Sequence, residues 1–224
     1  MKKIIWLAII LAVVLLAGYF YFTRPVQAPT APIGDVSAKM PAGTPGQSGL
    51  MYRIGTGSEA RFSIYELLNG KDKTVVGTTA EIGGDMKVVD SKLEIGTITI
   101  NARTLKTDSD SRDGAVGRFI LKSETSGNEF ITFTPAGIVT SSGPVVEGKE
   151  VSFSVSGNLT ISGIIAPATF SGRVTLSNGV LTGTAETKLS RSTYKLVVPS
   201  LSFIANIPDE FTVGATIVAR NIAI

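Results

Sequence analysis

Large apolar and small polar residues alternate along residues 151–162. Successive side chains of a β-strand point to opposite faces, so this pattern predicts a strand with one apolar face. The apolar phase consists of Val151, Phe153, Val155, Leu159 and Ile161. Most strands run five or six residues, so this length predicts a tall, curved sheet with an apolar inner wall. Such a sheet can close around a ligand.

The next segment continues the alternation and turns back at Asn178-Gly179. We predict a turn over residues 163–167 and then an apolar phase made of Ala168, Phe170, Gly172, Val174 and Leu176. Asn-Gly is the strongest short signal for a two-residue type I′ hairpin. This turn places Leu176 opposite Leu181.

The remainder of the chain beyond residue 48 also has the pattern of a β-sheet, with one helix. Further strands are predicted over residues 60–65, 74–76, 87–89, 94–102, 129–134 and 211–224. Residues 111–121 are the only helix candidate there, with Arg112, Asp113 and Arg118 expected in solvent. The pattern therefore predicts an all-β fold with a single short helix.

The chain begins with a candidate membrane anchor. Residues 4–22 carry no charge and follow Lys2 and Lys3. A helix of this length just crosses a hydrocarbon layer of about 30 Å, and flanking lysines favour the cytoplasmic side. We predict a cytoplasmic stub over residues 1–3, a single transmembrane helix over 4–22 and an extracytoplasmic location, periplasmic or extracellular, for the rest. A cleaved signal peptide ending at residues 26–28 is the alternative.

A Pro-rich segment separates the anchor from the remainder. Residues 23–48 hold five prolines among Ala, Gly, Thr and Ser. This composition buries too little apolar surface to fold, so we predict a flexible linker. Residues 49–224 then form one domain, which is long enough to bury its own core.

Composition excludes several function classes. The chain has neither Cys nor His, which removes disulfides, thiol nucleophiles, Cys/His zinc sites and His-dependent triads. From residue 49 onward, 17 basic residues balance 17 acidic ones. A neutral domain lacks the basic surface that nucleic acid requires, so we expect no nucleic-acid partner. We also expect no catalytic residue, no metal and no cofactor.

Residues 62–68 and 74–79 resemble the membrane-tethered branch of the YceI-like family. Several further segments resemble the family as a whole. They are Gly157–Phe170, Thr97–Asp108, Ser111–Asp113, Arg118–Leu121 and Phe130–Phe133. The resemblance covers about residues 51–220. It implies an extended antiparallel lipocalin-like β-barrel of about eight strands around a tunnel that takes polyisoprenoid or similar lipid chains. The His found in typical members after the Arg-Asp pair is missing, because Gly114, Ala115 and Val116 follow Asp113.

The inner apolar strip is the candidate ligand site. It consists of Phe62, Ile64, Phe133, Phe153, Val155, Leu159, Ile161, Phe170 and Val174. A barrel of about eight strands has room for its own side chains or for one slender ligand. Arg112 and Arg191 are candidate head-group contacts, since a guanidinium can hold a phosphate or quinone oxygen.

Three functions follow from this interpretation. The first is a membrane-anchored lipid-binding protein that sequesters or transports a long isoprenoid-type chain, such as a polyisoprenoid or quinone. The second is a non-catalytic structural or interaction module of the cell envelope with a filled barrel. The third is an enzyme that uses only Asp, Glu, Tyr or Lys, although no spacing suggests a catalytic pair. The sequence does not predict the oligomeric state.

Overall fold

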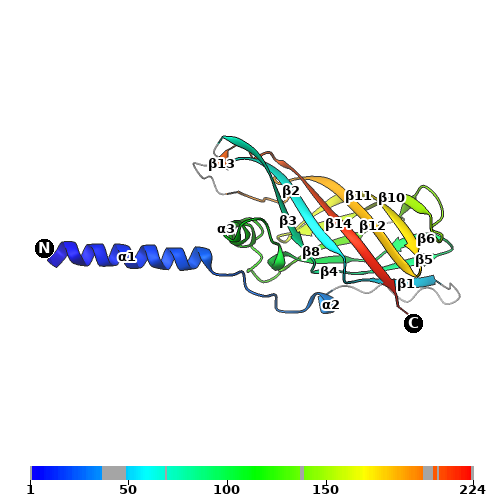
Figure 1. Cartoon of the computed structure of the whole chain (residues 1–224), viewed down its shortest axis with the longest axis horizontal. Helices are drawn as coiled ribbons and strands as arrows, with labels where there is room; N and C mark the ends of the chain where they lie inside the picture. Colours follow the sequence, from blue (N-terminus) through cyan, green and yellow to red (C-terminus); the bar gives the residue numbers. More distant parts are fainter. Residues whose placement is uncertain are drawn as a thin grey trace.

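The computed structural model describes residues 2–36, 49–68, 70–136, 139–198, 204–205 and 207–222. It consists of a curled antiparallel sheet and a long N-terminal helix that projects from one end of the sheet (Figure 1). The helices are α1 (Lys2–Thr23), α2 (Ile33–Val36), the 3-10 turn η1 (Ala102–Thr104), α3 (Asp110–Ala115) and the π-helical turn η2 (Val116–Ile120). The strands are β1 (Gly49–Ile54), β2 (Glu59–Leu68), β3 (Lys71–Thr79), β4 (Ile82–Gly83), β5 (Asp85–Val89), β6 (Lys92–Ile95), β7 (Ile98–Asn101), β8 (Phe130–Pro135), β9 (Thr140–Ser141), β10 (Glu150–Ile161), β11 (Ile164–Ser177), β12 (Val180–Ser190), β13 (Ile204–Ala205) and β14 (Glu210–Asn221).

The sheet is all-β and antiparallel, as predicted, but its closure differs from the prediction. Its hydrogen-bonded path runs β4-β7-β8-β10-β11-β12-β14-β1-β5-β6, with the other strands branching from it. Within the described residues this path does not form a ring, so a curled sheet with ten strands along its path replaces the expected closed barrel of about eight. The reason is that β14 pairs first with β2 and then with β1, which divides the sheet. A bridge between Thr78 and Lys106, with two hydrogen bonds of 2.8 Å, joins the β3 edge to the segment after η1.

The long central hairpins have the predicted register. Leu176 pairs with Leu181 and Ser171 with Glu186, and both residues of the Asn178-Gly179 turn have positive φ. The turn expected over residues 163–167 is shorter in the structure. It consists of Ser162 and Gly163, both with positive φ, and β11 already begins at Ile164. A two-residue turn with this backbone suits the twist of the strands it joins, so 164–167 extend the sheet.

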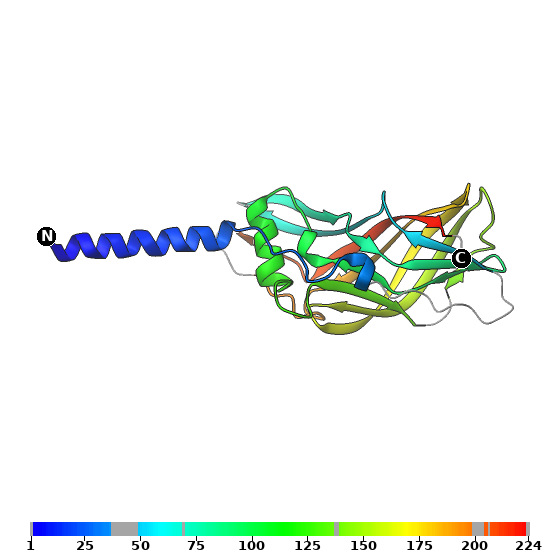
Figure 2. The same ribbon diagram turned by 90° about the horizontal axis from the view of Figure 1, so that it is seen from below.

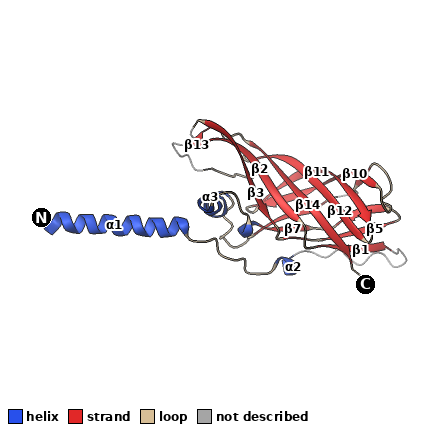
Figure 3. Ribbon diagram, viewed as in Figure 1, coloured by secondary structure: helices blue, strands red, loops and turns tan. Residues whose placement is uncertain are grey.

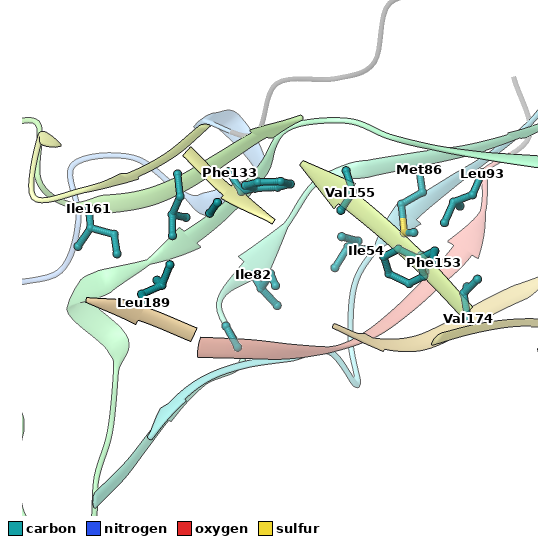
Figure 4. Packing of buried hydrophobic residues seen from close by; sticks show 14 of the residues in the cluster. Ile54, Ile82, Met86, Leu93, Phe133, Phe153, Val155, Ile161, Val174 and Leu189 are labelled. Atoms are coloured by element: carbon teal, nitrogen blue, oxygen red, sulfur yellow. The ribbon is translucent and has the colours of Figure 1, made fainter. Parts of the chain in front are cut away.

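The interior of the sheet differs between its two ends. The end that carries the Asn178-Gly179 turn is filled by side chains, among them Tyr52, Val151, Val174, Leu176 and Leu181. Figure 4 shows the buried apolar side chains following one another along the interior, from Val174 at one end to Ile161 at the other.

Helix α2 lies beside the sheet, whereas α1 and α3 lie at that other end of the strands (Figure 3). α3 and η2 lie across it, and α1 contacts α3 and points away from the sheet. Two residues predicted to lie in solvent are buried in the structure. They are Asp113 of α3 and Arg118 of η2. Asp113 accepts hydrogen bonds from the backbone N–H and hydroxyl of Thr107 and pairs with Lys106 at 3.2 Å. These partners compensate the carboxylate for its lost hydration.

Helix α1 exposes apolar side chains along its length, including those of Trp6, Leu11 and Leu15. Of the helices in the described part of the chain, none combines the length and the apolar character that a bilayer span requires. The membrane span predicted for residues 4–22 is therefore not supported by the structure.

The first part of the predicted linker is docked against the domain. Figure 2 shows the chain after α1 running along the end and side of the sheet. Arg103 donates hydrogen bonds to the carbonyls of Ala28 (2.5 Å) and Ser123 (2.6 Å), and pairs with Glu129 at 3.2 Å. Glu129 in turn accepts two hydrogen bonds from Thr30, at 2.8 and 3.0 Å.

A second contact lies closer to α1. Arg24 pairs with Glu124 at 2.9 Å, and its carbonyl accepts a hydrogen bond from the guanidinium of Arg118. Val26 packs so closely on Gly117 that a Cβ there would come within 2.9 Å of it. Residues 24–30 therefore form a docked segment, in contrast to the predicted free spacer, while residues 37–48 lie outside the described residues.

The docked segment makes the stability of the fold depend on pH. The two hydrogen bonds from Thr30, aided by the charge of Arg103, lower the pKa of Glu129 below its ordinary value of 4.5. A carboxylate with a lowered folded pKa stabilises the fold above its unfolded pKa, and this contribution is lost as pH falls through the folded pKa. We expect Glu129→Gln to lower the urea midpoint of the full chain clearly at pH 7 and hardly at all at a pH below the lowered, folded-state pKa of Glu129. An equal loss at both pH values would contradict this role.

Candidate ligand cavity

A cavity of about 290 Å³ lies inside the curled sheet and extends from the helical end, at Ala115, Val116 and Ile120, to Ile54, Met86 and Ile95 of β1, β5 and β6. Its volume is at the lower end of the range for ligand pockets, roughly 300–1,000 Å³. The wall is almost entirely apolar and is built from the inward faces of the strands and from α3 and η2. Such a wall can bury a slender apolar chain and offers it little hydrogen bonding.

The residues predicted to line the interior lie where the alternation places them, with one exception. All of them except Val174 line the cavity. Phe133 of β8 and Phe170 of β11 meet edge to face at a centroid distance of 4.9 Å. Val174 is buried but belongs to the filled end, because its neighbours there leave no space along the axis. Six of these side chains are buried, Phe62, Ile64 and Phe170 are half-buried, and the contact of the set with a ligand stays a prediction.

A row of small residues across three strands creates the space. Ala185 of β12, Ala215 of β14 and Ala60 of β2 are successive register partners, and all three line the cavity. Each projects only a methyl group, so the row cannot fill the centre of the curled sheet. The row nearer the hairpin contains Leu176 and Leu181, whose larger side chains do fill it. Side-chain size along the strands therefore decides where the interior is hollow.

Helical residues close the end of the cavity that faces α1. Ala115 of α3 and Val116 and Ile120 of η2 line it. Ser109 caps α3 by accepting a hydrogen bond from the N–H of Arg112, which fixes where the helix begins. The π-helical turn of η2 directs Val116 and Ile120 to the same, cavity-facing side.

A charged cluster lies at this helical end. Arg112 of α3 pairs with Glu66 of β2 at 3.0 Å and also with Asp108. Both Arg112 and Glu66 line the cavity, and the Glu66 side chain is only 6% exposed. Lys73 of β3 completes the cluster by bonding Asp108 at 2.7 Å. That bond, with the charge of Arg112 added, lowers the pKa of Asp108 below its ordinary value. The cluster therefore holds two cations and two carboxylates in contact.

The second predicted arginine also lines the cavity, but its guanidinium serves the backbone. Arg191 donates to the carbonyls of Leu196 (3.2 Å), Ile207 (3.1 Å) and Pro208 (2.8 Å). These bonds tie the chain after β12 to the chain that leads into β14. Because its guanidinium is bound to these carbonyls, Arg191 is poorly placed to bind a head group. Arg112, together with Glu66, Asp108 and Lys73, remains a candidate head-group contact.

Glu66 is the site residue that sequence reasoning missed. Its signal is present in the sequence, because Phe62, Ile64 and Glu66 follow one another at every second position. Continuing the inward phase by one step places a carboxylate on the inner face. The sequence pattern could not identify the partner of Glu66, because Arg112 lies 46 positions further along the chain.

Comparisons with known proteins give a family and a fold. The family described as YceI-like domain matches residues 52–219. The crystal structure of Burkholderia cenocepacia BcnA is similar, with a TM-score of 0.55 and 15% identity over 71% of this chain and 95% of that one. A polyisoprenoid binding domain from Saccharophagus degradans, implicated in plant cell wall breakdown, gives a TM-score of 0.58 and 15% identity over 77% of this chain and 99% of that one. No curated protein matches the chain.

Proposed function

The chain belongs to the YceI-like family, and on this basis we propose that its domain binds a long apolar isoprenoid-type chain in the cavity. The observation that carries the proposal is the cavity of about 290 Å³ with its almost wholly apolar wall. Each buried CH2 group contributes about 0.8 kcal/mol, so a prenyl chain gains affinity with length and needs no catalytic group. The name of the similar Saccharophagus degradans domain, which is called polyisoprenoid binding, supports the same ligand class.

In this proposal the protein sequesters or transports the chain and performs no catalysis. The ionisable side chains at the cavity are already joined in ion pairs or bound to backbone carbonyls, as for Glu66 with Arg112 and for Arg191. A general acid or base needs a group that is free to exchange a proton with a substrate. The paired state of these groups therefore favours binding over reaction.

Mass spectrometry of an organic extract tests the ligand class directly. We expect protein purified without detergent to release a lipid that contains isoprene units, and delipidated protein to take up added geranylgeraniol in a one-to-one ratio. Heat-unfolded protein is the control for lipid that merely adheres to apolar surface. No lipid in repeated extracts, together with no uptake of the added chain, would contradict the proposal.

We propose further, from the sequence, that residues 4–22 attach the domain to a membrane and that residues 49–224 lie on its extracytoplasmic side. The uncharged run after Lys2 and Lys3 and the exposed apolar side chains of α1 support this location. We expect the full chain to stay with membranes in alkaline carbonate, and the domain to be digested by protease added outside spheroplasts. A chain that begins at Arg24 is the control and should be soluble. Recovery of the full chain in the soluble fraction would refute the attachment.

A further inference from the structure

We infer that the cavity selects chains with an uncharged polar end, such as an alcohol or a quinone, over chains that end in a phosphate, and that Glu66 determines this selection. The inference rests on the proposed function, since it concerns the end group of the same ligand. It follows from the state of the three arginines that line the cavity in the described residues: Arg61, Arg112 and Arg191.

Of these three arginines, Arg112 alone forms an ion pair with another residue that lines the cavity, Glu66. Two carboxylates, Glu66 at 3.0 Å and Asp108, already occupy it. Arginine binds phosphate strongly through two parallel hydrogen bonds from the guanidinium. A phosphate would have to displace Glu66 from Arg112, which would leave a carboxylate buried in an apolar wall without its partner.

The other two arginines cannot take over this role. The guanidinium of Arg191 is bound to three backbone carbonyls. The side chain of Arg61 is 56% exposed and pairs with Glu186 at 3.4 Å, away from the inward phase of β2 that Phe62 and Ile64 share. Within the part of the chain that the structure describes, no net positive charge is therefore available where the end of a bound chain would lie.

An uncharged end group fits the same cluster without displacing anything. A hydroxyl can donate to a carboxylate oxygen of Glu66 or accept from Arg112, and a quinone carbonyl can accept from Arg112. Neither adds charge to a cluster in which Arg112 and Lys73 already balance Glu66 and Asp108. A phosphate brings up to two negative charges close to Glu66 in surroundings of low polarity, where like charges repel strongly.

The test compares two ligands that share one chain, geranylgeraniol and geranylgeranyl monophosphate, by competition against a fluorescent prenyl probe. We expect delipidated full-length protein to bind the alcohol at least tenfold more tightly than the phosphate. Glu66→Gln keeps the shape of the side chain and removes its charge, so we expect it to shift the preference toward the phosphate by at least tenfold. Asp108→Asn, at an exposed position, should shift it in the same direction by about threefold. Glu150→Gln is the matched control, because it removes one negative charge from an exposed pair with Arg173, and it should leave the preference unchanged.

The outcomes separate the inference from the proposed function. If wild-type protein binds both ligands equally, or the phosphate more tightly, the inference is overturned and the proposed function stands. If it binds neither, both are overturned. The wild-type comparison and Asp108→Asn decide the question even if Glu66→Gln does not fold. A preference shifted equally by Glu150→Gln would show a general charge effect and would also overturn the role of Glu66.

Discussion

Replacement of Ala215 by Trp is expected to weaken the binding of a prenyl chain by roughly 50-fold. Ala215 lies in the row of small residues that keeps the cavity open, between Ala185 and Ala60. An indole at this position would occupy the space of several methylene groups. Exclusion of about three of them, at about 0.8 kcal/mol each, corresponds to this loss of affinity. The measurement is the Kd for geranylgeraniol in delipidated protein.

Thr216→Trp is the control for this experiment. Thr216 is the next residue of β14, and it is exposed on the outer face. The same large side chain there should leave the Kd within about twofold. Overpacking at Ala215 would itself cost about 1–3 kcal/mol of stability, so both variants need a check by thermal unfolding. Unchanged affinity in folded Ala215→Trp would show that the ligand does not enter the cavity.

Replacement of Arg103 by Met is expected to lower the free energy of unfolding by about 3–5 kcal/mol, the usual cost of removing one partner of a buried ion pair. Arg103 is 9% exposed and joins Glu129, Ser123 and Ala28 through its guanidinium. Without it the carboxylate of Glu129 loses its charge partner, and the docked segment 24–30 loses one of its anchoring points. Urea unfolding of the full chain measures the loss, which corresponds to roughly 6–20 °C in Tm.

Arg173→Met supplies the comparison for Arg103→Met. Arg173 pairs with Glu150 at 3.5 Å, and both side chains are more than half exposed. Exposed pairs contribute about 0–1 kcal/mol, so this variant should unfold almost like the wild type. Equal losses in the two variants would mean that the cost comes from removing any arginine. A loss below about 1 kcal/mol in Arg103→Met would show that the docking of residues 24–30 does not stabilise the domain.

The alternation of the sequence was sufficient to predict much of the sheet and of the site. The phase that holds Phe153, Val155 and Phe170 faces inward, and the Asn178-Gly179 turn fixes the register beside it. These features are local, because a strand's facing and a two-residue turn depend on neighbouring residues alone. The resemblance to the YceI-like family, stated from short motifs, is confirmed over residues 52–219.

The remaining features depend on residues far apart in the chain. Arg112 was predicted to be solvated beside Asp113, but its partner is Glu66 on a different element. The docked segment likewise depends on Arg103, which meets Ala28 across 75 positions. Sequence periodicity cannot predict ion pairs of this kind. It assigns a side chain to one face of its element but does not identify the residue that lies opposite.

The sequence by itself thus determined an antiparallel sheet with an apolar inner face, because side-chain alternation is a property of each strand. Only the tertiary structure decided that this face surrounds a cavity along most of its length and a filled core next to the hairpin. The physical reason is that three alanines on three separate strands meet in one row, while Tyr52, Val151 and Leu181 meet near the hairpin. Space inside a protein is a property of the side chains that come together, and folding alone brings them together.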